Sequence, residues 1–288
     1  MVTRFMSVHV ETSRDVTARL AALWRYRELM WMLSWRDIRV RYKHSALGAA
    51  WAVMPPLLMM LIFTFVFGTI IGLDSRKLTG EVTLPYSLFA FSGLVPWTFF
   101  ANGLTAAIGS MVANRALVTK IYFPREVFPL AAIGSAFVDF LIALGLLVLL
   151  TLYMHFAPNG WHYHAHWTLV LLPVVITVQI AFMIGLGLLL SMANLFYRDV
   201  GFLFRSAIQL WMFVTCVVYQ LNATAGWKRV LIQLNPMTPI IRAYRDCLIL
   251  GRSPFDLSFC NAAAVSVMLL LIGWWWFRRR EFDFAENI

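Results

Sequence analysis

Long apolar stretches separated by short polar segments dominate this chain. A helix that crosses a bilayer needs about 20 consecutive, mostly apolar residues. Six stretches meet this length, over residues 49–71, 86–111, 127–154, 167–193, 200–220 and 258–277. The pattern predicts an all-α, polytopic membrane protein with a six-helix transmembrane domain over residues 49–277, an N-terminal region at 1–48 and a tail at 278–288.

Residues 20–43 show a different pattern. Their apolar and aromatic positions fall on one narrow stripe of a helix, while cations occupy a neighbouring face. The stripe consists of Leu20, Trp24, Trp31, Trp35, Ile38 and Tyr42, and the cations are Arg25, Arg36, Arg39 and Lys43. This arrangement predicts an amphipathic helix that lies in the cytoplasmic interface of the membrane. A helix docked on protein is the alternative, and the two are compatible.

A second irregular region, residues 221–257, is long and half apolar. Its apolar run over residues 230–234 is too short to span a bilayer, and the pairs Asn235-Pro236 and Thr238-Pro239 interrupt the region. Irregular backbone at membrane depth must pack on protein or line a wet cavity. We therefore expect short re-entrant or surface helices before the last span.

Composition excludes a soluble domain and argues against nucleic-acid binding. Hydrophobic residues make up 61% of the 288 residues and charged residues 13%, against about 45–50% and about 25% in soluble domains. The net charge of +10 is spread between apolar segments, so no polar module exists to read nucleic acid. A bilayer must therefore replace water around most of the chain.

The distribution of Lys and Arg sets the expected orientation. With the N-terminus inside, sixteen of them fall in cytoplasmic segments and seven in outside segments, which agrees with the positive-inside bias. The sixth predicted span ends in three tryptophans at 274–276, followed by three arginines at 278–280. This is typical of an anchor at the inner interface. We therefore expect both termini in the cytoplasm.

The chain carries no recognisable catalytic or cofactor motif. None of its four lysines follows a glycine, so the usual phosphate-binding loop of an ATPase is missing. His162, His164 and His166 alternate in a predicted outside loop and would share one face of an extended strand. No carboxylate or cysteine lies near them, so we interpret them as a polar loop, with a metal site as the alternative. We expect no catalytic residue, metal or cofactor in this chain.

Two features inside the predicted spans indicate helix contacts. Asp139 is a deep acid, and an intramembrane carboxylate usually faces the protein interior. We expect it to make a structural hydrogen bond, with proton coupling as the alternative. The small-residue pairs Ala181 with Gly185 and Gly187 with Ser191 favour close helix packing over a hinge.

Aromatic residues make up 15% of the chain, and some are candidates for a path that sugars follow. Sugar rings present C–H faces that stack on aromatic rings. Candidates on the second and fifth predicted spans are Phe89, Trp97, Phe100, Phe204, Trp211 and Tyr219. The alternative is lipid contact and interfacial anchoring, which explains most aromatic residues in membranes.

Several short sequence blocks resemble those of a known family and follow one another in the same order as in that family. They cover residues 36–43, 47–53 with 55–56, 89–100, 117–125, 194–200 and 234–237. The first reads RDIRVRYK, the third FAFSGLVPWTFF and the last LNPM. The chain resembles the permease subunit of polysaccharide-exporting ATP-binding-cassette transporters. Within that family the O-antigen branch is most similar, and teichoic-acid permeases are near.

This resemblance implies a homodimer of six-helix permeases in the bacterial cytoplasmic (inner) membrane, with two separate ATPase subunits that bind ATP and Mg²⁺. It implies export of a polysaccharide linked to undecaprenyl diphosphate, and an ATPase-coupling helix in the first cytoplasmic loop. The coupling candidates here are Asn114, Arg115, Leu117, Lys120, Tyr122, Phe123, Pro124, Arg125 and Glu126. Apolar residues with charged neighbours suit docking on a protein cleft; a solvated connector is the alternative.

On this hypothesis, cations at the inner interface attract the lipid diphosphate through charge-assisted hydrogen bonds. The candidates are Arg39, Arg41, Lys43, Arg198 and Arg205. Positive-inside topology and contact with lipid headgroups are the ordinary alternative. Alternatives for the whole chain are a teichoic-acid or capsule exporter permease, an ion-coupled flippase or drug exporter, and a membrane enzyme that uses the histidine loop.

Two departures from the family pattern fall near the expected outer gate. Thr215-Cys216 and Tyr219-Gln220 stand where we expect a Ser-Pro and a Tyr-Pro. Arg242 stands where we expect an acidic residue before Arg245. These departures leave the geometry of the gate and the chemistry of the glycan open.

Overall fold

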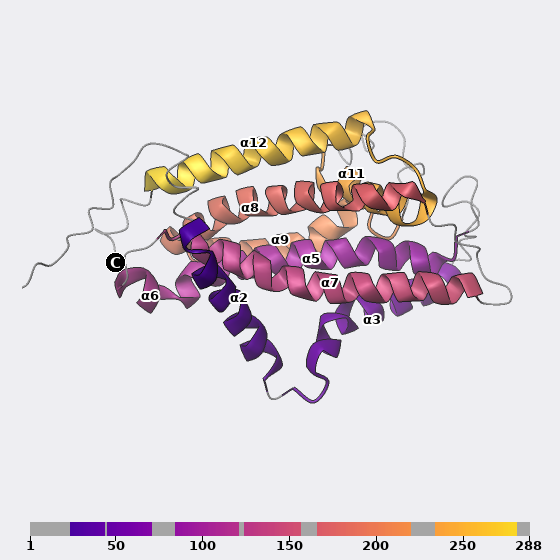
Figure 1. Cartoon of the computed structure of the whole chain (residues 1–288), viewed down its shortest axis with the longest axis horizontal. Coiled ribbons are helices and arrows are strands. Elements are labelled where there is room, and N and C mark those ends of the chain that lie inside the picture. Colours follow the sequence, from indigo (N-terminus) through magenta and orange to yellow (C-terminus); the bar gives the residue numbers. More distant parts are fainter. Residues whose placement is uncertain are drawn as a thin grey trace, which may run out of the picture.

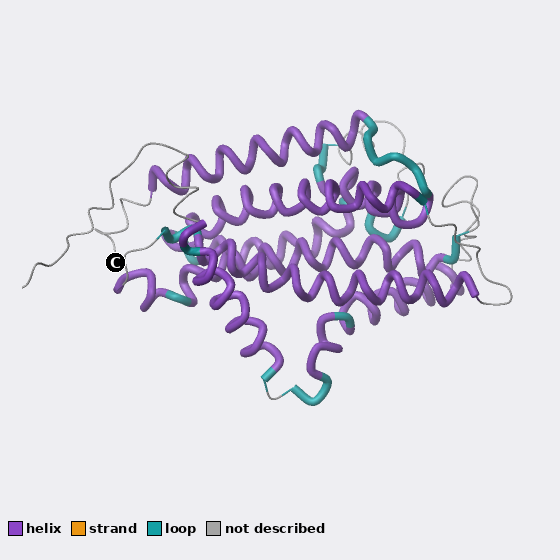
Figure 2. Tube along the Cα trace, viewed as in Figure 1, coloured by secondary structure: helices purple, strands orange, loops and turns teal. Residues whose placement is uncertain are grey.

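The computed structural model describes residues 24–43, 45–70, 84–120, 124–156, 166–219 and 234–280. Within these residues the regular structure is entirely helical, without a β-strand. Figure 1 and Figure 2 show long helices that lie side by side in an elongated bundle. The predicted all-α fold class is therefore confirmed.

Four long helices form the body of the bundle. They are α5 (Tyr86–Ala113), α7 (Val127–Phe156), α8 (Leu172–Phe196) and α12 (Leu257–Arg280). α5 packs against α7 and α8, and α8 packs against α12. Leu88, Phe91, Phe100 and Leu104 of α5 have no exposed surface, so α5 forms the centre of the core.

Among the described residues, three helices are long and apolar enough to cross a membrane. They are Val127–Phe156, Trp167–Phe196 and Leu257–Arg280. The second begins with the short helix η3 (Trp167–Leu171) and continues as α8. These bounds agree with the third, fourth and sixth predicted spans within a few residues, and the count of six spans stays a prediction.

The first and fifth predicted spans are less regular than a single long helix. Residues 48–70 form η1 (Gly48–Ala52), α3 (Met54–Phe63) and η2 (Thr64–Ile70). α9 (Asp199–Val214) ends before the predicted limit at residue 220. The Thr215 hydroxyl donates back to the Trp211 carbonyl at 2.7 Å, and Cys216 takes up a left-handed backbone conformation with a φ of 52°. The predicted fifth helix is therefore too long at its C-terminal end.

The N-terminal helix α2 (Arg27–Tyr42) is docked on the bundle. The Ser34 hydroxyl donates a hydrogen bond to the Ala131 carbonyl of α7 at 2.9 Å. Ile38, which the pattern placed on a lipid-facing stripe, is buried, whereas Trp31 is 64% exposed. The docked alternative is therefore confirmed, and the location of α2 in the membrane interface stays a prediction.

Short helices precede the last span, as predicted. α11 (Met237–Arg245) continues into η5 (Asp246–Leu250), and α11 packs against α5, α8 and α12. The Asn235 amide nitrogen donates to the Thr215 hydroxyl at 2.8 Å, and its amide oxygen accepts from the Trp211 indole at 3.1 Å. Asn235 therefore fixes the start of α11 to the end of α9. Residues 220–233 lie outside the described part of the chain.

The small residues of α8 permit close helix packing. A Cβ atom on Gly185 would lie 2.5 Å from backbone atoms of Leu269 and Leu270 in α12, and Gly273 of α12 faces Gly185 in return. A Cβ atom on Gly187 would lie 3.4 Å from Ala107 of α5. The predicted packing role of these glycines is confirmed.

Candidate transport and coupling sites

Asp139 of α7 is tied to the C-terminal end of α2. Its carboxylate forms an ion pair with Arg41 and accepts a hydrogen bond from the Tyr42 hydroxyl at 2.7 Å. Burial, assisted by the hydrogen bond to Asp139, raises the pKa of Tyr42 to about 12. The hydroxyl therefore stays protonated as a donor at neutral pH. The predicted structural hydrogen bond of Asp139 is confirmed.

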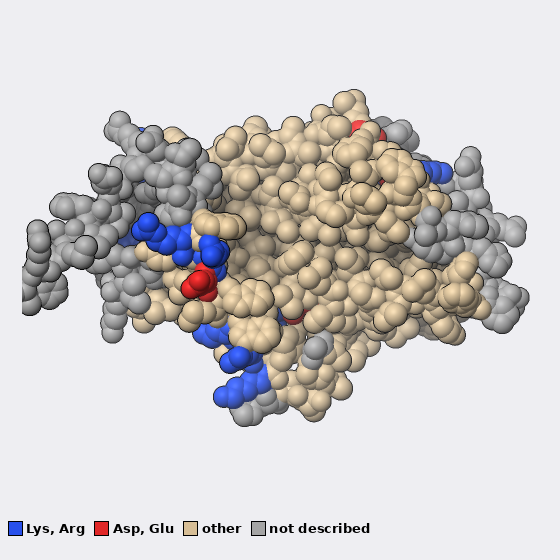
Figure 3. All heavy atoms as spheres, in the orientation of Figure 1, with Lys and Arg blue, Asp and Glu red and all other residues tan. Residues whose placement is uncertain are grey.

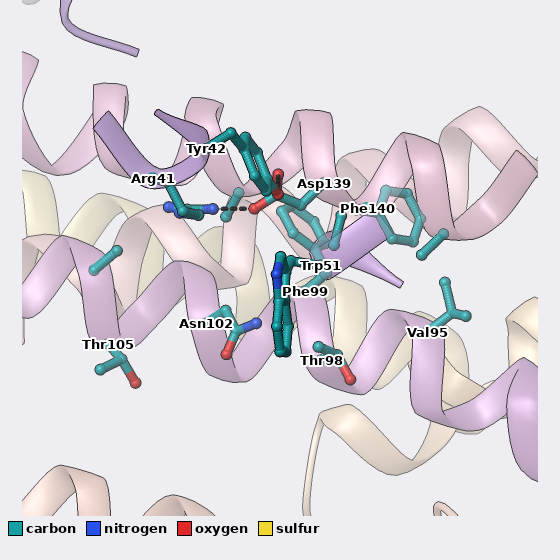
Figure 4. A pocket seen from close by; sticks show the side chains of 14 residues that line it. Arg41, Tyr42, Trp51, Val95, Thr98, Phe99, Asn102, Thr105, Asp139 and Phe140 are labelled. Carbon is teal, nitrogen blue, oxygen red and sulfur yellow. Dashed lines mark hydrogen bonds and ion pairs between the residues drawn. The ribbon is translucent and has the colours of Figure 1, made fainter. Parts of the chain in front are cut away.

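A cavity of about 340 Å³ opens beside this ion pair. Arg41, Tyr42 and Asp139 line one side, and α5 lines the opposite side (Figure 4). The polar lining residues of α5 are Thr98, Asn102 and Thr105, and η1 contributes Trp51. The cavity thus brings an ion pair, hydroxyl and amide groups and an indole ring together.

Two of the five candidate cations for a lipid diphosphate line different cavities, Arg41 the one beside Asp139 and Arg205 a second one. Arg41 is already engaged by Asp139. Arg39 lies over the Trp35 ring, 5.4 Å from its centroid. All five candidate side chains are exposed, namely those of Arg39, Arg41, Lys43, Arg198 and Arg205. Figure 3 shows basic side chains along α2, whereas the visible face of the bundle is largely uncharged.

The predicted path aromatics take part in helix packing. Phe89, Trp97, Phe100 and Phe204 are buried, whereas Trp211 and Tyr219 are half-buried. The Phe100 ring stacks on Phe182 of α8 at 5.7 Å and meets Trp211 of α9 edge-on at 5.2 Å, measured between centroids. These rings join α5, α8 and α9 within one chain. Their role along a glycan path stays a prediction.

A buried cation, Arg245, lies among three elements near the N-terminal end of α5. The guanidinium of Arg245 in α11 lies over the Phe89 ring, 3.8 Å from its centroid. It donates to the carbonyls of Phe89 and Cys216, each at 3.3 Å, and to the Val217 carbonyl. The Ser92 hydroxyl accepts a further bond at 3.4 Å. Arg245 therefore holds α5, α11 and the turn after α9 together.

Arg242, which departs from the family pattern, has two acidic neighbours. Its guanidinium lies 3.6 Å from the Asp246 carboxylate and 3.4 Å from the Asp256 carboxylate. The side chain is 59% exposed. The cation at this position is therefore balanced locally, near the surface.

The predicted coupling segment, residues 114–126, follows α5 and includes α6 (Arg115–Lys120). The Asn114 amide nitrogen donates to the Ser110 carbonyl at 2.8 Å, and its oxygen accepts from Arg36 of α2 at 2.9 Å. The segment is thus linked to the N-terminal helix. Arg115 is exposed, Asn114, Leu117, Pro124 and Arg125 are half-buried, and Glu126 is buried. Tyr122, Phe123 and the Lys120 side chain lie outside the described part.

The histidine loop falls largely outside the described residues. His162 and His164 are not among them, and His166 directly precedes η3. Where the structure describes the chain, no three His, Cys, Asp or Glu residues come together as metal ligands.

Comparison with known proteins places this arrangement in a family. A family model described as ABC-2 type transporter matches residues 28–249, from α2 into η5. The chain belongs to the ABC-2 type transporter family. For this ABC-2 permease, the matched region contains α2, the coupling segment and Arg245.

Several named relatives match most of the ABC-2 permease. The O-antigen export system permease protein RfbA of Myxococcus xanthus is 29% identical over 268 residues, covering 92% of this chain and 97% of the relative. A protein of the same name from Klebsiella pneumoniae is 29% identical over 226 residues, with 78% and 81% covered. The polysialic acid transport protein KpsM of Escherichia coli is 23% identical over 217 residues, with 75% and 79% covered.

Two contacts in the ABC-2 permease were not predicted from its sequence. Arg36 and Asn114 are 78 residues apart, and Arg245 and Phe89 are 156 residues apart. Nothing local in the sequence indicates the first contact. Arg245 carries a weak signal, because a cation next to apolar helix positions needs partners when it is buried.

Proposed function

We propose that this ABC-2 permease is the transmembrane subunit of an ATP-driven exporter of a lipid-linked polysaccharide such as O-antigen. Similarity to O-antigen export permeases over most of the chain supports this proposal. The carrier is undecaprenyl diphosphate, and transport crosses the bacterial cytoplasmic membrane. Two copies of this chain form the path, and two ATPase subunits that bind ATP and Mg²⁺ drive it.

The proposed mechanism depends on the position of the coupling segment in the bundle. α6, the N-terminal end of α2 and the arginine-rich end of α12 lie at one end of the bundle (Figure 1). Because Lys and Arg favour the cytoplasmic side, we assign this end to the cytoplasm together with both termini. An ATPase at this end contacts α6, and the Arg36–Asn114 hydrogen bond passes the movement on to α2.

Reversing two charges in the coupling segment tests the proposal. We expect Arg115→Glu combined with Lys120→Glu to lower the appearance of glycan at the cell surface at least about tenfold, because like charges at a docking surface oppose binding. Surface glycan and the amount of ATPase that copurifies with the tagged permease are measured together. Arg279→Glu is the control, because it reverses an exposed charge at the same end of the bundle but outside the segment.

The export measurement tests coupling through this segment, and the copurification measurement tests whether an ATPase partner exists. Normal export by the double variant, at the level of the Arg279→Glu control, would show that coupling does not pass through this segment. Copurification of a stoichiometric ATPase with the unaltered permease is expected. Its absence would favour the ion-coupled flippase or drug exporter instead.

We further propose that cations at the C-terminal end of α2 attract the diphosphate of the carrier lipid. Arg39 and Lys43 are exposed there, while Arg41 is engaged by Asp139. A cation without an acidic partner attracts a diphosphate group through charge-assisted hydrogen bonds. Arg198 and Arg205, near the start of α9, form a second exposed pair of candidates.

Charge reversal at these positions is expected to impair export. Arg39→Glu with Lys43→Glu should reduce the export rate about tenfold or more at unchanged permease levels, because each reversal removes an attraction and adds a repulsion. The rate is measured as new surface glycan after synthesis is switched on. Arg25→Glu with Arg27→Glu, at the opposite end of the same helical segment, makes the same change in net charge. Equal export by both double variants would exclude a specific role for Arg39 and Lys43.

A capsule polysaccharide is the second candidate substrate. The similarity to the Escherichia coli polysialic acid transport protein over 217 residues favours it. The two substrates are distinguished by deleting the permease and identifying which surface polymer disappears and which lipid-linked precursor accumulates inside the cell.

A further inference from the structure

The cavity beside Asp139 has a lining that differs from the other outward surfaces of the bundle. The exposed side chains of α7 and α12 include Leu141, Leu149, Leu152, Met268, Leu271 and Ile272. Such apolar side chains are suited to lipid. The outward positions of α5 in the cavity are instead Thr98, Asn102 and Thr105. Polar side chains are disfavoured against lipid tails, so this part of α5 faces a polar environment.

Polar groups in the cavity are available to a ligand. Within the described part of the chain, neither the Asn102 amide nor the Thr98 hydroxyl has a hydrogen-bond partner, whereas Thr105 donates to the Ala101 carbonyl at 2.7 Å. Asn102 is exposed and Thr98 half-buried. Asn102 offers two donors and an acceptor, and Thr98 offers one donor and an acceptor. The cavity therefore presents unused hydrogen-bonding capacity on α5.

An aromatic surface completes the cavity. Trp51 of η1 is 52% exposed and lines the same space as Phe99. In Figure 4, Asp139 and Arg41 lie on the upper side of the cavity, and Thr98 and Asn102 lie on the lower side. An indole face beside hydroxyl and amide groups binds a ring that is apolar on its faces and rich in hydroxyls at its edge. A single sugar residue has this chemistry.

The net charge of the cavity lining favours a sugar over a phosphate as the ligand. Arg41 and Asp139 neutralise each other as an ion pair, so no uncompensated cation remains to bind a diphosphate. The remaining lining residues named above are neutral. The volume of about 340 Å³ is at the lower end of the range of small-ligand sites, about 300–1,000 Å³. Both features favour one neutral, hydroxyl-rich ring.

We propose that this cavity is a subsite for one sugar residue of the moving glycan. Asn102 and Thr98 hydrogen-bond to its hydroxyl groups, and Trp51 stacks on its face. The Asp139 carboxylate accepts a hydrogen bond from a further sugar hydroxyl. The proposal rests on the proposed export function. It assigns sugar contact to residues of α5, α7 and η1 that are distinct from the predicted path aromatics.

Labelling of a cysteine at position 102 tests the subsite in the complete complex. Asn102→Cys is made together with Cys260→Ser, because Cys260 is exposed while Cys216 and Cys247 are buried. In native membranes that contain the ATPase, we expect a water-soluble maleimide to label position 102 severalfold faster than Leu149→Cys in the same background. We also expect labelling to slow severalfold in cells that synthesise the glycan, compared with cells whose glycan synthesis is blocked.

An export measurement accompanies the labelling. Asn102→Leu should lower surface glycan about tenfold at unchanged permease and ATPase levels. The reason is that each sugar residue that passes the cavity loses its hydrogen bond to the Asn102 amide. Asn102→Gln should retain most of the export, since it keeps the amide. Normal export by Asn102→Leu, or labelling that is identical with and without glycan, would exclude the subsite. Absence of labelling in both strains would show that lipid or a second copy of the chain covers this face, and would also exclude it.

Deleting the permease separates this proposal from the proposed function. If deletion removes the surface glycan while position 102 fails the tests above, the export function stands and the subsite is wrong. If deletion leaves the surface glycan intact, the export function itself is wrong and the subsite is wrong with it.

Discussion

Gly185→Ala is expected to destabilise the permease strongly, although it adds a single methyl group. The new Cβ would lie 2.5 Å from backbone atoms of Leu269 and Leu270 in α12. Backbone atoms within a helix do not rotate aside as a flexible side chain does, so α8 and α12 must separate along their contact. Overpacking in a well-packed core costs about 1–3 kcal/mol, and occasionally more. We expect the decrease in the free energy of unfolding for Gly185→Ala to lie at the upper end of this range.

Gly145→Ala is the matched control for this prediction. Gly145 is also inside a long helix, α7, but a Cβ atom there would meet nothing within 4 Å. Alanine has a higher helix propensity than glycine by about 1 kcal/mol, so this variant should be neutral or slightly stabilising. Heating the purified permease in detergent and measuring the remaining monodisperse fraction compares the two. Equal loss of folded protein by both variants would contradict the close α8–α12 contact.

Sequence patterns predicted the long helices well because that signal is local. Over α7, α8 and α12, the apolar run, its length and the bounding polar residues all lie in one continuous stretch. The end of α9 was not predictable in this way. It depends on Asn235, which bonds to Thr215 and Trp211 from a segment 20 or more residues later. An apolar run that continues to residue 220 gives no sign of this contact.

The faces of the helices were harder to predict than the helices themselves. In a membrane protein, both the core and the lipid-facing surface are apolar, so composition does not tell one from the other. Phe89 and Phe100 were chosen as path candidates for their rings, and the structure buries both. Asn102, on the same helix, is exposed. An aromatic ring therefore did not indicate the open face of α5.

Ion pairs across the chain also lay beyond the reach of sequence patterns. Asp139 was correctly expected to have a partner, but its partners Arg41 and Tyr42 are 98 and 97 residues away. The sequence offered several cations near Arg41 on the same helical segment, with equal charge and similar spacing. Only the docking geometry of α2 on α7 selects among them.

Arg245→Ala is expected to produce the second large loss of stability. The guanidinium is buried and serves the carbonyls of Phe89, Cys216 and Val217 at one point. Its removal takes away the donor of the Cys216 and Val217 carbonyls, whereas the Phe89 carbonyl still accepts from the Ser92 hydroxyl at 2.8 Å. Each buried acceptor left without a donor costs about 1–3 kcal/mol. It also removes the cation above the Phe89 ring. We therefore expect the free energy of unfolding to fall by about 3 kcal/mol or more.

Arg242→Ala, one helical turn earlier in α11, provides the comparison. Arg242 is exposed, and its ion pairs with Asp246 and Asp256 span 3.6 and 3.4 Å. The Asp256 side chain is 40% exposed, whereas the Asp246 side chain is only 11% exposed, so only the Arg242–Asp256 pair is a surface ion pair of about 0–1 kcal/mol. Because the Arg242 guanidinium itself is solvated, this variant should lose less stability than Arg245→Ala. Arg245→Lys should fall between the two, because one ammonium group does not reach all the acceptors that the guanidinium fork serves. Thermal unfolding of the three purified variants measures the order. If Arg245→Ala were no less stable than Arg242→Ala, the guanidinium would not be what joins α5, α11 and the turn after α9, and that end of the bundle would depend on apolar packing alone.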